Sequence, residues 1–163
     1  HWADVAATLD GLVAAGKIGA VGVSNFTPAQ TRALAAHLKA PLVSTQPEFS
    51  PLALNPLFDG TLDLAMEMGQ AVLGWSPLGQ GRLGDGDPRP GRKKAEDERL
   101  IRVKAALAAH GAGFGVGIAA TAYAWVLAHP AGITPIIGSQ NPARIAEAAD
   151  AFARAVEAGS RTP

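Results

Sequence analysis

The sequence alternates short apolar segments with longer segments of helical periodicity, and this alternation limits the possible folds more than any other feature. Four apolar segments are too short for helices and are bounded by glycine or polar residues, as buried strands are. Each is followed by enough chain for a crossover helix, so neighbouring strands are expected to run parallel. The predicted strands are residues 18–23, 42–46, 71–75 and 133–137, and the predicted helices are residues 4–15, 27–38, 55–68, 95–110 and 118–129 and a last one from residue 141.

The length of 163 residues suits one domain, so residues 1–163 are expected to form a single α/β unit. A closed barrel of eight strands and eight helices usually needs about 250 residues. The 14 basic and 14 acidic residues cancel, which argues against a nucleic-acid or membrane partner. The sequence has no signal-peptide layout, no apolar segment long enough for a membrane span and no cysteine, so we expect a cytoplasmic location.

Polar side chains follow each predicted strand, at the end where ligands bind in parallel α/β proteins. The amide and hydroxyl groups of Asn25, Gln46 and Ser76 suit a neutral polar group such as a carboxamide. Trp75 offers a flat apolar face to a ring. Simpler interpretations stay open: a turn or helix cap for each polar residue, and core packing for Trp75.

The exit of the last predicted strand has the features of an anion site. Asn141 and Pro142 are expected to start the final helix, whose first backbone N–H groups can bind an anion. Arg144 lies in the first turn, where a cation opposes the helix dipole, and a bound phosphate resolves that conflict. The alternative is a surface arginine that pairs with Glu147 or Asp150.

The long loop after the third predicted strand contains a misleading glycine motif. Residues 79–84 read GQGRLG, but the following DGDPRPGRKK does not begin a helix, so we reject a Rossmann-type dinucleotide fingerprint. Residues 76–95 are rich in glycine and proline and form either a flap over a ligand or a disordered loop. No metal-ligand spacing joins the histidines, and no nucleophile–base pair is readable. Tyr123 lies in an apolar helix and is expected in the core.

Five segments together resemble the aldo-keto reductase family, in the family's order and over essentially the whole chain. They are similar to the family's GK(I/V)…GVSNF, NQxE(Y/F)xPL, (Y/W)SPLxxGxL, (L/Y)AW(V/L)L and closing PIxG(S/T)xxxxRIxE patterns. The tryptophan before SPL is most similar to bacterial members. The matching segments are residues 16–26 (GKIGAVGVSNF), 46–52 (QPEFSPL), 74–83 (GWSPLGQGRL), 123–127 (YAWVL) and 135–147 (PIIGSQNPARIAE).

The resemblance implies the C-terminal half of a (β/α)8 barrel and an NADP(H)-dependent reduction of an aldehyde or ketone by hydride transfer. It also implies sites for each part of the cofactor. Residues similar to those at the nicotinamide are Ser24, Asn25 and Gln46 at the carboxamide and Trp75 against the ring. Residues similar to the pyrophosphate loop are Ser76, Leu78, Gln80 and Gly81. Residues similar to the 2′-phosphate site are Gly138, Ser139, Gln140 and Arg144, with Glu147 near the adenine and Ala148 where the family often has asparagine.

The family's catalytic Asp, Tyr and Lys belong to the first half of the barrel, and this chain contains none of their motifs. The family's catalytic histidine ends the strand before the first helix seen here. His1 is therefore a candidate for it, although its spacing to GVSNF is shorter than in the family. Without a proton donor, the chain alone is expected to show no turnover.

Two other interpretations stay open. One is a non-catalytic NADP(H)-binding regulatory subunit of the same fold, because the WSPL motif also resembles that of potassium-channel beta subunits. The other is a half-barrel that completes its sheet as a homo-oligomer, because four parallel strands leave two open edges. For the enzyme, the expected partner is a small-molecule carbonyl substrate, and its identity is not readable from the sequence.

Overall fold

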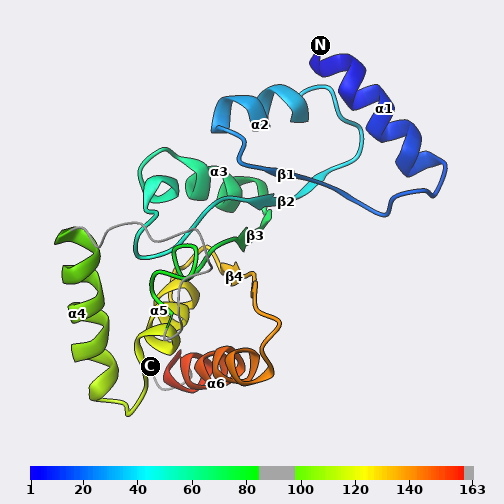
Figure 1. Cartoon of the computed structure of the whole chain (residues 1–163). Helices are drawn as coiled ribbons and strands as arrows, with labels where there is room; N and C mark the ends of the chain where they lie inside the picture. The colour runs from blue at the N-terminus through cyan, green and yellow to red at the C-terminus, as the bar shows by residue number, and fades with distance from the viewer. Residues whose placement is uncertain (85–97, 160–163) are drawn as a thin grey trace.

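The computed structural model describes residues 1–84 and 98–159, with side chains as far as residue 151 in the last helix. Four parallel strands alternate with helices, which confirms the predicted fold class. The strands lie in chain order, between α1 and α2 at one end of the molecule and α5 and α6 at the other (Figure 1). The elements are α1 (Trp2–Ala14), β1 (Val21–Ser24), α2 (Pro28–Ala35), β2 (Leu42–Gln46), the 3-10 turn η1 (Asn55–Leu57), α3 (Thr61–Met68), β3 (Ala71–Gly74), α4 (Glu98–Ala112), α5 (Ile118–Leu127), β4 (Thr134–Pro135) and α6 (Pro142–Gly159).

The helix that was predicted to run from residue 55 to residue 68 is two elements. Gly60 has a left-handed backbone with a φ of 83°, which separates the turn η1 from α3. The Asp59 carboxylate accepts from the backbone N–H of Thr61 at 2.9 Å and so supports the start of α3. The apolar residues of the predicted helix lie mostly on α3, where Leu62 and Leu64 are buried.

The first and last strands are shorter than predicted. In the first, residues 18–20 precede the pairing, and the Ile18 side chain packs against the α1–α2 side of the sheet. The last strand is only Thr134–Pro135, because proline has no N–H to continue the ladder. Beyond it, the backbone N–H of Ile136 still donates to Gly74 O at 2.8 Å, so the end of β4 stays fixed beside the end of β3.

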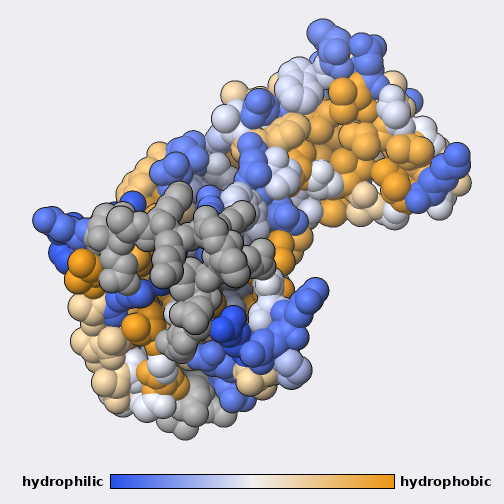
Figure 2. Space-filling view, in the orientation of Figure 1, coloured by the Kyte–Doolittle hydropathy of each residue, from blue (hydrophilic) through white to orange (hydrophobic). Residues whose placement is uncertain are grey.

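Two apolar clusters cover the sheet on its helical side. One lies under α1 and α2 and includes Val21, Val23 and Leu42 from the strands. Figure 2 shows apolar side chains at the surface along the flank of α1 that faces this cluster. The other cluster lies between β3, α3 and α5 and is centred on Phe49, whose side chain is fully buried.

Within this chain, β1 and β4 each pair on one side, so the other edge of each is open in the described structure. The homo-oligomer that would close these edges stays a prediction. None of the helices that the structure describes has both the length and the apolar composition that a membrane crossing requires.

Asp10 joins α1 to the connection between α2 and β2. Its carboxylate accepts from the backbone N–H of Lys39 at 3.1 Å and from that of Ala40 at 3.0 Å. These two bonds hold the pKa of Asp10 below its usual range, because they favour the charged form. The stabilisation is therefore present above the pKa of the unfolded chain and is lost as the pH falls through the lower, folded value.

We predict that Asp10→Asn lowers the thermal midpoint at neutral pH, because the amide loses the charge that strengthens both bonds. The difference from wild type is expected to shrink at about pH 2, because the stabilisation by the charge falls once the pH is below the pKa of the unfolded chain. Thermal unfolding followed by circular dichroism at both values measures this. Asp150→Asn, on the exposed face of α6, is the control. A difference that grows as the pH falls would show that Asp10 does not act through its charge.

Candidate functional site

Three neighbouring strand ends bring four of the predicted site residues into one hydrogen-bonded cluster. Ser24 Oγ donates to the backbone carbonyl oxygen of Gln46 at 3.0 Å, and the backbone N–H of Asn25 donates to the same oxygen at 3.2 Å. Trp75 Nε1 donates to Asn25 Oδ1 at 2.9 Å and joins the end of β3 to the end of β1. The structure thus places the residues expected at a carboxamide beside the residue expected to stack on a ring.

Three of the predicted site residues have a left-handed backbone, which non-glycine residues rarely adopt. The φ angle is 54° at Asn25, 51° at Ser76 and 61° at Gln80. In the described part of the chain, no other non-glycine residue has a positive φ. Such a conformation costs on the order of 1–3 kcal/mol, and it is found mainly where function requires it. The strain therefore marks the same edge of the sheet that the sequence indicated.

Glu48, at the end of β2, is a site residue that the sequence reasoning did not assign. Gln80 Nε2 donates to Glu48 Oε1 at 3.3 Å and joins the loop after β3 to the neighbouring strand end. Glu48 also forms a bridge with Trp75, in which Trp75 N donates to Pro47 O at 3.0 Å and Phe49 N donates to Trp75 O at 3.2 Å. The sequence contains one signal that could have found Glu48, because it is a charged residue among neutral side chains at the strand exits.

The described part of the predicted flap, residues 76–84, is packed against neighbouring elements. Leu83 is fully buried in a cluster with α4 and α5, and a Cβ atom on Gly79 would lie 2.7 Å from Leu52 Cδ1. Gly81 differs, because its φ is 87° and a Cβ atom there would meet open space. Backbone bonds from Gly79 N to Ser76 O at 2.8 Å and from Gly81 N to Leu78 O at 3.1 Å hold these turns in place. Residues 85–95 of the predicted flap lie outside the described residues.

The connection from β4 to α6 has the predicted helix start. Asn141 Oδ1 accepts from the backbone N–H of Ala143 at 2.9 Å, which confirms Asn141 as the N-cap. Ser139 Oγ accepts from the backbone N–H of Asn141 at 3.1 Å, and its own hydroxyl proton stays available for a ligand. Gln140 is exposed, and Gly138 has open space where a Cβ atom would lie.

Arg144 is exposed in the first turn of α6, and in the described structure no ion pair joins it to Glu147 or Asp150. The simpler interpretation of Arg144 as a paired surface residue therefore has no support. Glu147 is half-buried near Tyr123. Burial raises the pKa of the Tyr123 hydroxyl, and the Glu147 carboxylate raises it further. Tyr123 is 5% exposed, which confirms the prediction that it belongs to the core.

The connection from β4 to α6 and the loop after β3 pack on the same apolar cluster. Leu78 and Ile137 both pack against the cluster between α5 and α6 that contains Tyr123 and Ala148. Ala148 stands where the family often has asparagine, and it is buried in this cluster rather than facing a ligand. Leu78 of the predicted pyrophosphate loop and Ile137, next to the predicted 2′-phosphate site, therefore pack on one cluster.

His1 lies apart from the cluster at the strand ends. Its Nδ1 accepts from the backbone N–H of Ala3 at 3.3 Å, and its ring lies 5.9 Å from that of His37, just beyond α2. Figure 1 shows the start of α1 at the opposite end of the molecule from α6. The catalytic role of His1 stays a prediction. Among the residues described, no three histidine or acidic side chains are arranged to hold a metal ion.

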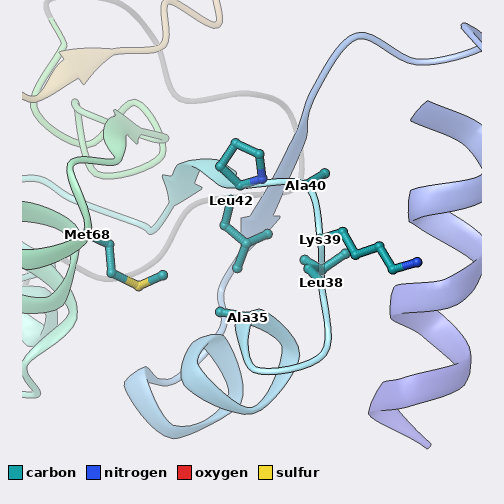
Figure 3. A pocket seen from close by; sticks show the side chains of 7 residues that line it. Ala35, Leu38, Lys39, Ala40, Leu42 and Met68 are labelled. Atoms are coloured by element: carbon teal, nitrogen blue, oxygen red, sulfur yellow. The ribbon is translucent and has the colours of Figure 1, made fainter. Parts of the chain in front are cut away.

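A pocket of about 250 Å³ lies at the amino end of β2, away from the strand exits (Figure 3). It is formed by the end of α2, the connection to β2 and Met68 at the end of α3. Figure 3 shows the Lys39 side chain pointing away from it, toward α1. The side chains that line the pocket, other than Lys39, are all apolar. We place the candidate site at the strand exits instead.

The parallel sheet carries polar residues at the carboxyl ends of its strands, where α/β proteins bind their ligands. The aldo/keto reductase family model matches residues 1–158 of this chain. The chain belongs to the aldo/keto reductase family, which confirms the resemblance of its motifs.

Named relatives agree with this assignment. The chain is 48% identical over 152 residues to a 6-dehydroglucose reductase of Novosphingobium aromaticivorans. The aligned residues cover 93% of this chain and 47% of that protein. It is 40% identical over 144 residues to a protein of the same name from Agrobacterium fabrum, covering 88% and 44%. It is 37% identical over 148 residues to the oxidoreductase YdhF of Escherichia coli, covering 91% and 46%. The chain spans about half the length of these curated relatives.

A solved structure shows the same fold. The thermostable aldo-keto reductase Tm1743, crystallised with the inhibitor epalrestat, superimposes with a TM-score of 0.78 at 22% sequence identity. The superposition covers 94% of this chain and 50% of that protein. The four βα units described above therefore have the arrangement of half of an aldo-keto reductase barrel.

Proposed function

We propose that this chain is the C-terminal, cofactor-binding half of an NADP(H)-dependent aldo-keto reductase. One observation carries the proposal: the hydrogen-bonded cluster of Ser24, Asn25, Gln46 and Trp75 at three adjacent strand ends. Neutral donors and acceptors beside an indole are the groups that a carboxamide on an aromatic ring requires.

The remaining residues fit the rest of a dinucleotide phosphate. Gly81 and Gly138 leave open space at the two places where phosphate groups are expected. The amino end of α6 attracts negative charge through its dipole, although Asn141 Oδ1 already accepts from the backbone N–H of Ala143. Arg144, exposed and without an ion pair in the described structure, supplies the charge-assisted bonds that a 2′-phosphate would accept.

In this proposal, the chain binds and orients and does not transfer protons. The amides of Asn25 and Gln46 fix the carboxamide, and one face of Trp75 supports the ring. The turns at residues 76–81 surround the pyrophosphate. When bound, NADPH supplies the hydride. The groups that protonate the carbonyl oxygen are expected on the other half of the barrel, with His1 as the candidate from this chain.

The substrate class follows from the relatives. Two of them carry the name 6-dehydroglucose reductase, so a sugar that bears a carbonyl group is the first substrate to test. We extend the proposal to a cytoplasmic location, because a reductase of this kind needs the cell's pool of NADPH.

Calorimetric titration of the intact protein with NADPH and with NADH, followed by an assay of carbonyl reduction, tests the proposal. We expect tight binding of NADPH, weaker binding of NADH, and reduction of an aldehyde or ketone. We expect no turnover by the 163-residue chain alone. Failure to bind NADPH, or carbonyl reduction by the chain alone, would contradict the proposal. Binding without reduction of any carbonyl compound would instead support the regulatory subunit.

A further inference from the structure

The hydrogen bond between Trp75 and Asn25 joins residues that are 50 positions apart in the sequence. It runs from the end of β3 to the end of β1, across the end of the intervening β2. The donor and acceptor are 2.9 Å apart, which is the usual length of a strong N–H···O bond. Because it depends on the register of three strands, this contact is a property of the folded site and not of a local motif.

The chemistry of the indole decides which way the Asn25 amide faces. An indole nitrogen only donates, so the amide atom that faces Trp75 is the oxygen. The amide nitrogen of Asn25 and its two N–H groups must then face elsewhere. Asn25 is exposed, and in the described structure no residue accepts from its amide nitrogen. The side chain therefore turns its N–H donors toward a ligand, while its oxygen already accepts from Trp75.

The backbones of both residues are held as well. Asn25 N donates to Gln46 O at 3.2 Å, and Asn25 stays at a φ of 54°. Trp75 donates from its N to Pro47 O and accepts at its O from Phe49 N. Neither backbone can move without breaking the pairing at the strand ends. The pair is thus preorganised, and a ligand does not have to order it.

We propose that Trp75 is a positioning residue that sets the ligand specificity of Asn25. Its indole N–H holds the Asn25 amide so that the two N–H donors face the ligand, which favours the carbonyl oxygen of a carboxamide or of a ketone in the same place. This role is separate from stacking, which any aromatic ring at position 75 supplies. The proposal rests on the proposed function, because it takes a nicotinamide as the ligand.

Two probes separate the donor and acceptor roles of Asn25. NADP+ carries a carboxamide, and its 3-acetylpyridine analogue keeps the carbonyl oxygen but has no amide N–H. In wild type, Asn25 gives the same bond to both, so the ratio of their dissociation constants reflects other residues. In Trp75→Phe the ring remains but the amide is free to turn and accept from the carboxamide N–H. The ratio is then expected to change in favour of NADP+.

Three substitutions at two positions test the mechanism through binding and not through activity. Trp75→Phe is expected to weaken NADP+ by about fivefold to tenfold, the size of one lost neutral hydrogen bond. Asn25→Asp keeps an acceptor for the indole but has no N–H donor, so it is expected to lose binding even though the Trp75 contact persists. In the Asn25→Ala background, Trp75→Phe is expected to cost nothing further, because the partner through which it acts is gone.

The state of the contact is visible without any cofactor. The chain has three tryptophans, and Trp75→Phe identifies the indole resonance of Trp75 in a proton–nitrogen correlation spectrum. That resonance is expected to stay in the range of a hydrogen-bonded indole N–H in Asn25→Asp and to move out of that range in Asn25→Ala. Circular dichroism shows which variants remain folded, and Asn25→Asp tests the proposal if Trp75→Phe does not fold.

The outcomes distinguish the two proposals. If wild type binds NADP+ but the losses from Trp75→Phe and Asn25→Ala simply add, Trp75 acts only by stacking and the inference is wrong while the proposed function stands. The same holds if the indole resonance is unmoved in Asn25→Ala. If wild type binds neither NADP+ nor its analogue, the proposed function fails and the inference fails with it.

Discussion

Replacing Phe49 by alanine is expected to lower the free energy of unfolding by about 3–5 kcal/mol, the usual cost of removing a fully buried phenylalanine. The side chain is 0% exposed and packs with Leu62, Val72 and Ile133. Its ring also lies 5.2 Å from the Trp125 ring, at an angle of 22°. A marginally stable domain loses much of its stability with such a change.

The position of Phe49 also predicts weaker cofactor binding in this variant. Its backbone N–H donates to Trp75 O, and its Cβ lies against Gly74 at the end of β3. A cavity at Phe49 therefore loosens the strand end that holds Trp75. Urea unfolding measures the stability. The matched control is Phe58→Ala, since Phe58 is 81% exposed and its loss is expected to cost less than about 0.5 kcal/mol. Equal losses for the two variants would show that Phe49 is not at the centre of the core.

Replacing Arg144 by alanine is expected to weaken NADPH by about tenfold to a hundredfold, which corresponds to about 1.5–3 kcal/mol for hydrogen bonds to a charged group. NADH has no 2′-phosphate, so its affinity is expected to change little. The reason is the location of Arg144, exposed in the first turn of α6 and joined to neither Glu147 nor Asp150 in the described structure. Calorimetric titration of the intact protein with both cofactors measures the two affinities.

Arg102→Ala is the matched control for the loss of one positive charge. Arg102 lies on α4 and pairs with Glu98 one turn away at 3.7 Å, so neither cofactor is expected to bind differently. An equal loss of NADPH and NADH in Arg144→Ala would remove the 2′-phosphate role. A similar loss in Arg102→Ala would point to a general effect of charge instead.

Features that depend on local sequence could be predicted. The strand at residues 42–46 has the predicted bounds because its apolar residues stand between a proline and polar residues. α2 begins where the Thr-Pro pair predicts. Thr27 is the N-cap and forms a capping box with Gln30, and Pro28 is the first residue of the helix. Asn141 and Pro142 likewise start α6 where expected. In each case the signal lies within a few residues.

Features that depend on the register of distant strands could not be predicted. The bond between Trp75 and Asn25 requires three strands to end side by side, and the Gln80–Glu48 bond requires the loop after β3 to turn back onto β2. The left-handed backbone of Ser76 has no local signature, because serine rarely adopts it. The motif resemblance located these residues, but the contacts among them come from the fold.

The central claim is that the four strand exits form one NADP(H) site, and hydrogen exchange of the intact protein with and without NADPH tests it most directly. The backbone N–H groups of residues 24–26, 46–49, 75–81 and 138–144 are predicted to exchange more slowly when NADPH is bound. Those around the apolar pocket at residues 35–42 are predicted not to change. Slower exchange confined to the pocket, or no change at the strand exits at saturating NADPH, would contradict the claim.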